Sequence, residues 1–209
     1  MTLRKTLLYL IVFISGAVVL SLEILASRIL QPKFGSSVYV WGSLIAIFLA
    51  GLAAGYYLGG EIADRNGSFT RFGLLLLFSA ALVAAVSFLS KPICNAIYQR
   101  LGMESVDRLG PLFASLALFF IPTAALGTVS PYAVRLFADD PAKLGRQVGT
   151  LYALSTVGSI LGTLETTFFL IVWLPTPRAV LLLAAVQALL ACLALTYGRF
   201  AAPEHRAED

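Results

Sequence analysis

The stretch that decides the fold is Phe48–Gly67, FLAGLAAGYYLGGEIADRNG, in which an apolar run turns abruptly polar. Its glycines Gly51, Gly55 and Gly59 are four residues apart. In a helix this spacing places all of them on one face, where a second helix can approach closely. From Glu61 onward the residues are mostly polar. This change predicts that a membrane-spanning helix ends there and that a short charged turn begins.

The composition of the whole chain assigns it to the membrane proteins. Of 209 residues, 59% are hydrophobic and only 12% are charged, whereas soluble domains carry about 25% charged residues. The apolar runs are continuous and lack the alternation of a membrane β-barrel. We therefore expect an all-α integral membrane protein with one transmembrane domain, residues 1–198, and a short polar cytoplasmic tail, residues 199–209.

Apolar runs long enough to cross a bilayer predict about six transmembrane helices. The predicted helices cover roughly residues 6–29, 38–60, 71–90, 111–136, 147–173 and 179–197. Pro122 and Pro131 predict that the fourth helix is bent, since proline removes a backbone hydrogen bond. Residues 93–110 mix apolar and charged side chains, and they predict an amphipathic surface helix or an ordered loop. Residues 139–146 predict a polar turn.

The basic residues of the short loops predict the orientation. With both termini in the cytoplasm, nine Lys and Arg residues fall on the inner side and six on the outer side, as the positive-inside rule favours. We expect a multi-pass protein of a bacterial-type inner (plasma) membrane. The net charge of +4 is explained by this topology, so no nucleic-acid partner is expected.

A second glycine pair, Gly158 and Gly162, lies in the fifth predicted helix. The second and fifth predicted helices thus both carry glycines on one face, and each is the middle helix of a set of three. This arrangement suggests two inverted three-helix repeats, as in the halves of many transporters. The alternative is that both glycine sets serve helix packing alone.

Two motifs resemble known families. Residues Gly59–Gly67, GGEIADRNG, are similar to the loop between helices 2 and 3 of the major facilitator superfamily, roughly G-x-L-A-D-R-x-G-R, although Ser68–Thr70 replaces the basic pair that follows there. A longer series comprises Leu22, Glu23, Arg28, Phe34–Ser37, Ala63, Asp64, Arg65, Pro122, Gly127, Pro131, Arg135, Gly149, Leu151, Tyr152, Ala153, Gly158 and Gly162.

That series resembles the membrane domain of the spermidine-synthase-like membrane proteins, over about residues 10–197. The resemblance implies a half-facilitator-like domain of six helices. In such fusions an aminopropyltransferase-like domain follows the last helix, whereas this sequence stops at Asp209. Aminopropyl-transfer chemistry is therefore not expected of it.

Polar side chains inside the predicted helices are the candidates for a substrate or proton site, because ionisable groups in a bilayer are costly. They are Glu23, Glu165 and Gln187. Two carboxylates that face one cavity would suit a cationic substrate or a proton relay. The alternatives are an ion pair of Glu23 with Arg28 or Lys33, and hydrogen bonds that Glu165 accepts from neighbouring threonines. For Gln187 the alternative is a purely interhelical role.

A second group, Asp64, Arg65 and Arg135, should lie at the cytoplasmic membrane edge. In the facilitator loop that this segment resembles, the acidic residue takes part in a conformational latch. A pair between Asp64 and Arg135 would then bias one state of the protein. The alternative is a helix end with basic anchors, or Arg135 capping the carbonyls of its helix.

These features favour a protein that binds or transports a small cationic metabolite such as a polyamine, either alone or as a homodimer. The main alternative is a non-transporting membrane subunit that anchors a separate soluble synthase-like enzyme or a larger complex. An embedded enzyme acting on lipids or thiols has only Cys94, Cys192 and the two glutamates in its favour. No catalytic motif, metal-ligand spacing or cofactor motif is found, so we expect no enzyme, metal or cofactor.

Overall fold

The computed structural model describes residues 3–101, 103–137 and 143–201, and within them it contains helices and no strand. The elements are α1 (Leu3–Phe34), α2 (Val38–Asn66), α3 (Phe69–Arg100), α4 (Met103–Gly127), α5 (Val129–Phe137), α6 (Leu144–Glu165), η2 (Thr166–Leu170), α7 (Ile171–Trp173) and α8 (Thr176–Ala201). They form six spans that are long and apolar enough to cross a membrane. The predicted fold class is confirmed.

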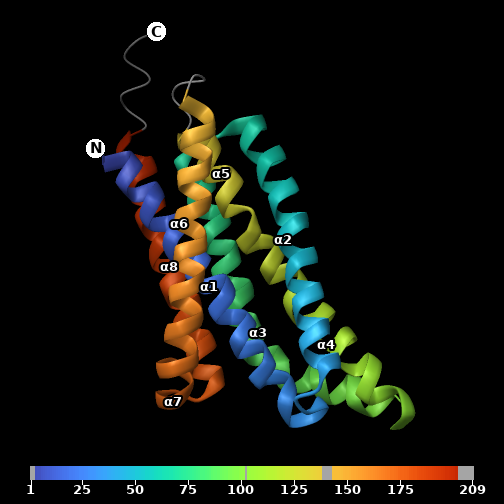
Figure 1. The fold of residues 1–209 in the computed structure, drawn as a ribbon. Coiled ribbons are helices and arrows are strands. Elements are labelled where there is room, and N and C mark those ends of the chain that lie inside the picture. The colour runs from blue at the N-terminus through green and yellow to red at the C-terminus, as the bar shows by residue number, and fades with distance from the viewer. Residues whose placement is uncertain (1–2, 102, 138–142, 202–209) are drawn as a thin grey trace.

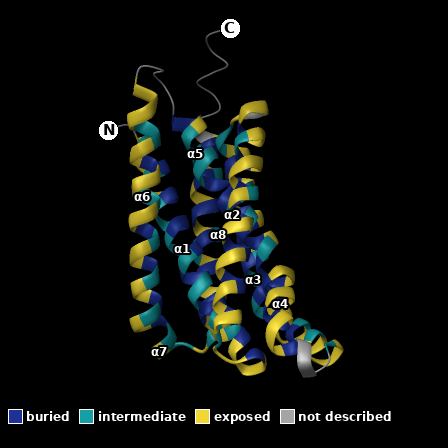
Figure 2. Cartoon of the chain, turned by 45° about the vertical axis from the view of Figure 1, so that its right-hand side comes forward, coloured by how far each residue is buried: buried dark blue, intermediate teal, exposed yellow. Residues whose placement is uncertain are grey.

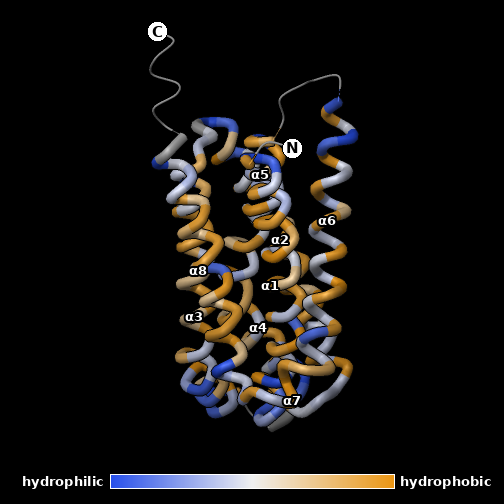
Figure 3. Tube along the Cα trace, turned by 90° about the vertical axis from the view of Figure 1, so that its left-hand side faces the viewer, coloured by the Kyte–Doolittle hydropathy of each residue, from blue (hydrophilic) through white to orange (hydrophobic). Residues whose placement is uncertain are grey.

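The six spans form one elongated bundle, in which the start of α1 and the end of α8 lie at the same end (Figure 1). Buried residues gather on the helix faces that point inward (Figure 2). Hydrophobic residues make up most of the length of the helices, whereas hydrophilic residues gather at the two ends (Figure 3). This distribution suits a bundle that lies across a bilayer.

Three helix pairs provide most of the interhelical contacts: α1 with α6, α2 with α4, and α3 with α8. If the spans are numbered one to six, these pairs join spans one and five, two and four, and three and six. Exchanging the first three spans with the last three leaves this set of pairs unchanged. The pairing therefore has the pattern that two three-helix repeats would produce.

The glycines of α2 lie directly against α4. A methyl group at Gly55 would overlap the carbonyl oxygen of Ala124, and one at Gly59 would lie 2.6 Å from the carbonyl oxygen of Thr128. The glycines of α6 lie against α1 in the same way, because Gly162 has the carbonyl oxygen of Ala17 2.5 Å from the position of its missing Cβ. Both glycine sets allow the close backbone approach that their spacing predicts.

Several predicted helix ends are wrong because the helices continue through polar residues. The helix α2 runs to Asn66, so the predicted charged turn is its last two turns, in which Arg65 and Glu61 pair at 3.6 Å. The helix α3 runs to Arg100 and includes Pro92, so residues 93–100 extend a spanning helix and form no separate surface helix. A proline costs a helix a hydrogen bond, which packing in a long helix can offset.

The end of α1 is also later than predicted, since the helix includes Pro32 and ends at Phe34. Gly35 stops it: its φ of 72° lies in the left-handed region, and its N–H donates to the carbonyl of Gln31 at 3.0 Å. This is a common glycine termination of a helix.

The fourth span is interrupted at Thr128, between α4 and α5. Pro131 has no N–H to donate to the carbonyl of Gly127, and the Thr128 hydroxyl donates to the carbonyl of Ala125 at 2.7 Å. The predicted irregularity thus occurs at Pro131, whereas α4 passes through Pro122 unbroken. In the fifth span, a π-helical turn, η2, follows Glu165, and no sequence pattern predicted it.

The remaining boundaries concern the last two spans. Of the predicted polar turn 139–146, residues 139–142 lie outside the described residues, and α6 already begins at Leu144. The helix α8 extends to Ala201, so the first residues of the predicted tail are helical. Residues 202–209 lie outside the described part of the chain.

Candidate functional site

A cavity of about 110 Å³ lies between α1, α2, α6 and the junction of α4 and α5. Side-chain hydroxyls provide much of its lining, from Ser15, Tyr56, Ser130, Tyr152, Ser155, Thr156 and Ser159. Helices from both predicted repeats thus contribute hydroxyl groups to one place. We call this the hydroxyl cavity.

Two tyrosines stand at the hydroxyl cavity on opposite helices. The ring of Tyr56 on α2 meets that of Tyr152 on α6 edge-on, with centroids 6.4 Å apart. Both side chains are about 40% exposed, so their rings are accessible from outside the bundle. Aromatic faces of this kind attract cations.

Glu23 lies one turn beyond the hydroxyl cavity on α1. It follows Gly16, Val19 and Leu20, which line the cavity, by seven, four and three residues, so it lies on the same helix face. Glu23 is only partly buried. It makes no hydrogen bond or ion pair with any residue that the structure describes, so the alternative of a pair with Arg28 or Lys33 is not observed.

A second polar cavity continues along this face of α1. It has a volume of about 290 Å³, and Ser27, Arg28 and Gln31 form its α1 side. Ser27 follows Glu23 by four residues and therefore lies on the same face. Glu23 lines neither cavity, but along α1 it lies between the residues that line the two, within a helix that is long and apolar enough to span a membrane.

Glu165 is placed differently. It is exposed at the end of α6 and lines none of the four cavities described for this chain. The α6 residues at the hydroxyl cavity include Tyr152, Thr156 and Ser159, whereas Glu165 follows Thr156 by nine residues and so lies on nearly the opposite side of the helix. The expected bonds from neighbouring threonines are not formed, since Thr163 donates to the carbonyl of Ser159 at 2.9 Å.

Gln187 is fully buried and is held by two neighbouring helices. Its Oε1 accepts from Ser15 of α1 at 3.2 Å, and its Nε2 donates to Ser79 of α3 at 3.1 Å. Both ends of the amide are therefore occupied by the protein itself. The interhelical role, which was the alternative for this residue, agrees with this geometry.

The predicted latch residues lie at the end of the bundle where α1 begins. Arg135 of α5 forms an ion pair with Asp64 of α2, with Nε 3.2 Å from Oδ1, and Arg65 pairs within α2 to Glu61. The contact between Asp64 and Arg135 is largely exposed. The pair therefore connects the end of span two to the end of span four, and its role as a latch stays a prediction.

Tyr132 is a residue of this region that the sequence did not single out. Its ring is buried and stacks on that of Phe72, with centroids 5.2 Å apart. Its hydroxyl donates to the carbonyl of Ser68 at 3.2 Å and accepts from the N–H of the same residue at 3.1 Å. The loop between α2 and α3 is thereby held against α5.

The chain was compared with protein-family models, curated proteins and solved structures, and nothing matched. The resemblance to the facilitator-like membrane domains thus stays an expectation from the motifs.

Proposed function

We propose that this multi-pass membrane protein binds a small cationic metabolite, of the polyamine class, on the polar face of α1 and carries it across the bilayer. The observation that supports this most is the position of Glu23 between two polar cavities, without a partner among the described residues. A carboxylate inside a spanning helix is costly unless it faces water, a cation or a proton pathway. The proposal includes an inner-membrane location with both termini in the cytoplasm, and transport without enzymatic chemistry.

The chemistry around Glu23 suits an elongated ammonium compound. The carboxylate supplies the negative charge, the hydroxyls of the hydroxyl cavity accept N–H bonds, and the rings of Tyr56 and Tyr152 offer cation–π contacts. A polyamine carries several ammonium groups on an apolar chain, so it would contact these elements in series. Asp64 and Arg135 would bias the conformational state from the end of the bundle.

The test is uptake of labelled spermidine into proteoliposomes by the unmodified protein and by Glu23→Gln. The amide keeps the shape but removes the charge, so we expect uptake to fall by at least about tenfold, as for loss of a charge-assisted hydrogen bond. Glu165→Gln is the matched control, because it removes a carboxylate of the same kind from another helix face. If Glu23→Gln takes up spermidine as fast as the unmodified protein, the proposed site is wrong. If both variants lose uptake equally, the substrate site is not restricted to the polar face of α1.

A second feature indicates that another protein chain packs against α6. The span Leu144–Trp173 is less buried than any of the other five spans, and it exposes Tyr152 and Thr156 beside the hydroxyl cavity. Polar groups on a spanning helix are costly against lipid. We propose that a second copy of the chain covers this face and closes the open side of the hydroxyl cavity. A separate enzyme or a larger complex in this place would correspond to the alternative function of an anchoring subunit.

A further inference from the structure

A larger cavity, of about 400 Å³, lies at the other end of the bundle between α1, α3 and the start of α8. It is separate from the hydroxyl cavity, since the two share no lining residue. Three of its twelve lining residues are cations, Arg28, Lys33 and Lys91, and none is acidic. We call it the cationic cavity.

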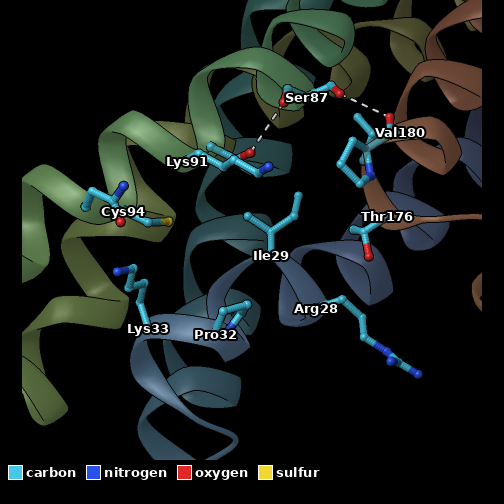
Figure 4. A pocket seen from close by; sticks show the side chains of 12 residues that line it. Arg28, Ile29, Pro32, Lys33, Ser87, Lys91, Cys94, Thr176 and Val180 are labelled. Carbon is cyan, nitrogen blue, oxygen red and sulfur yellow. Dashed lines mark hydrogen bonds between the residues drawn. The ribbon is translucent and has the colours of Figure 1, made fainter.

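The cations surround an apolar interior. Figure 4 shows Lys91 of α3 across the cavity from Lys33 and Pro32 of α1, with Ile29 between them. Arg28 and Lys91 form no ion pair or hydrogen bond with any residue in the described ranges, and Lys33 lies over the ring of Tyr98 at 5.3 Å. No acidic side chain that the structure describes therefore neutralises the positive charges of these three residues.

The walls of the cavity are tied together without a ligand. Ser87 of α3 donates to the carbonyl of Pro177 on α8 at 3.0 Å, and Ser90 donates to the carbonyl of Ser87 at 3.5 Å (Figure 4). The cavity also lies at the first residues of α8, Thr176 and Pro177. The positive end of this helix dipole adds to the attraction for an anion.

Apolar surface continues from the cavity along the outside of α3. Phe88 is 70% exposed and Leu89 is 49% exposed, next to the residues that line the cavity. A free inorganic anion would gain nothing from this surface, whereas an acyl chain would cover it. Basic pockets between spanning helices bind anionic lipid headgroups at the cytoplasmic side of membranes. The same combination of charge and apolar surface is present here at the end of α1 and the start of α8.

We propose that the cationic cavity binds the phosphate headgroup of an anionic phospholipid. The phosphate would lie among Arg28, Lys33 and Lys91, and the acyl chains would follow Phe88 and Leu89 along the bundle. The lipid would join α1, α3 and α8 at this edge. This inference does not depend on Glu23 or on the hydroxyl cavity, although Arg28 lines both the cationic cavity and the second polar cavity of α1.

The experiment titrates the purified full-length protein in non-ionic detergent with dioctanoyl phosphatidylglycerol, and follows bound lipid by native mass spectrometry. Dioctanoyl phosphatidylcholine is the zwitterionic comparison, and inorganic phosphate tests the soluble source. For the double variant Lys33→Gln/Lys91→Gln we expect the apparent Kd for phosphatidylglycerol to rise by about fivefold for each cation removed. The matched control, Arg100→Gln/Arg108→Gln, removes two exposed cations from the same end of the bundle and should bind as the unmodified protein does.

A variant that keeps all three cations separates binding from folding. Asn95 is exposed at the cavity, so Asn95→Trp fills its opening without altering the buried core, and it should also weaken phosphatidylglycerol binding. Unchanged binding in both cavity variants, or equal binding of phosphatidylcholine, would overturn the proposal. Displacement of the lipid by inorganic phosphate at similar concentrations would overturn the lipid assignment and would indicate that the cavity binds soluble phosphates.

Discussion

Gln187 shows how one residue can join three helices inside the bilayer. It belongs to α8, accepts from Ser15 of α1 and donates to Ser79 of α3. Water is absent from the core of a bilayer, so a buried amide there must find its partners within the protein. The same reasoning applies to the carboxylate of Glu23, which has no partner among the described residues.

Replacing Gln187 by Leu should destabilise the bundle. The change leaves the Ser15 hydroxyl without its partner, at a cost of about 1–2 kcal/mol. We expect the Tm in detergent to fall by about 2–6 °C for a chain of this size. Ser115→Ala is the control, because the Ser115 hydroxyl is equally buried and already has no partner. A Tm for Gln187→Leu no lower than that of Ser115→Ala would contradict this role.

At the scale of the elements, close helix pairs depend on the glycines of α2 and α6. Gly55 lies against Ala124 and Gly127 of α4, whereas nothing lies within 4 Å of a methyl group placed at Gly60 on the same helix. Without a hydrophobic force between helices in lipid, such close packing is a main source of their association.

The substitution Gly55→Val should therefore force α2 and α4 apart and cost about 1–3 kcal/mol, the usual cost of overpacking. Gly60→Val makes the same chemical change in open space and should be nearly neutral. Thermal unfolding of the two variants in detergent makes the comparison. Equal stability of both would show that the α2–α4 contact does not depend on Gly55.

The pair of Asp64 and Arg135 belongs to the same scale, because it connects two helix ends. Since the pair is exposed, its removal should alter stability little. If it biases a conformational state, Asp64→Asn and Arg135→Gln should each change the spermidine uptake rate while the Tm stays constant. The exchanged pair Asp64→Arg/Arg135→Asp should restore the rate. Single variants with unchanged rates would assign the residues to helix ends and membrane anchoring.

At the scale of the whole molecule, the open side of the hydroxyl cavity and the exposed α6 face make a second copy the expected neighbour. Purification in a gentle detergent followed by mass measurement should give a particle of two chains. Thr156→Leu, on the exposed α6 face beside the hydroxyl cavity, tests whether that face forms the contact, with Phe88→Ala on α3 as a control on a different helix. A monomer would contradict the homodimer, and stoichiometric recovery of another protein would support the anchoring alternative.

Much of the fold was predictable, and the errors have a common cause. The length of the apolar runs predicted the six spans, but the ends of α1, α2 and α3 were predicted too early, near residues 29, 60 and 90. A helix continues as long as its backbone hydrogen bonds are better than the alternatives, and charged residues near an end do not stop it. The hydropathy of a segment indicates which residues lie in the lipid core of the bilayer. A helix can continue beyond that core.

The sequence by itself determined the class, the number of spans and the faces that pack closely, because hydrophobic runs and glycine spacing act locally along the chain. Only the tertiary structure decided which polar residues have partners. Gln187 forms hydrogen bonds with two serines, Asp64 forms an ion pair with Arg135, and Glu23 has no partner among the described residues. These contacts depend on which helices pack together. The cationic cavity arises in the same way, since its cations come from different spans that only folding brings together.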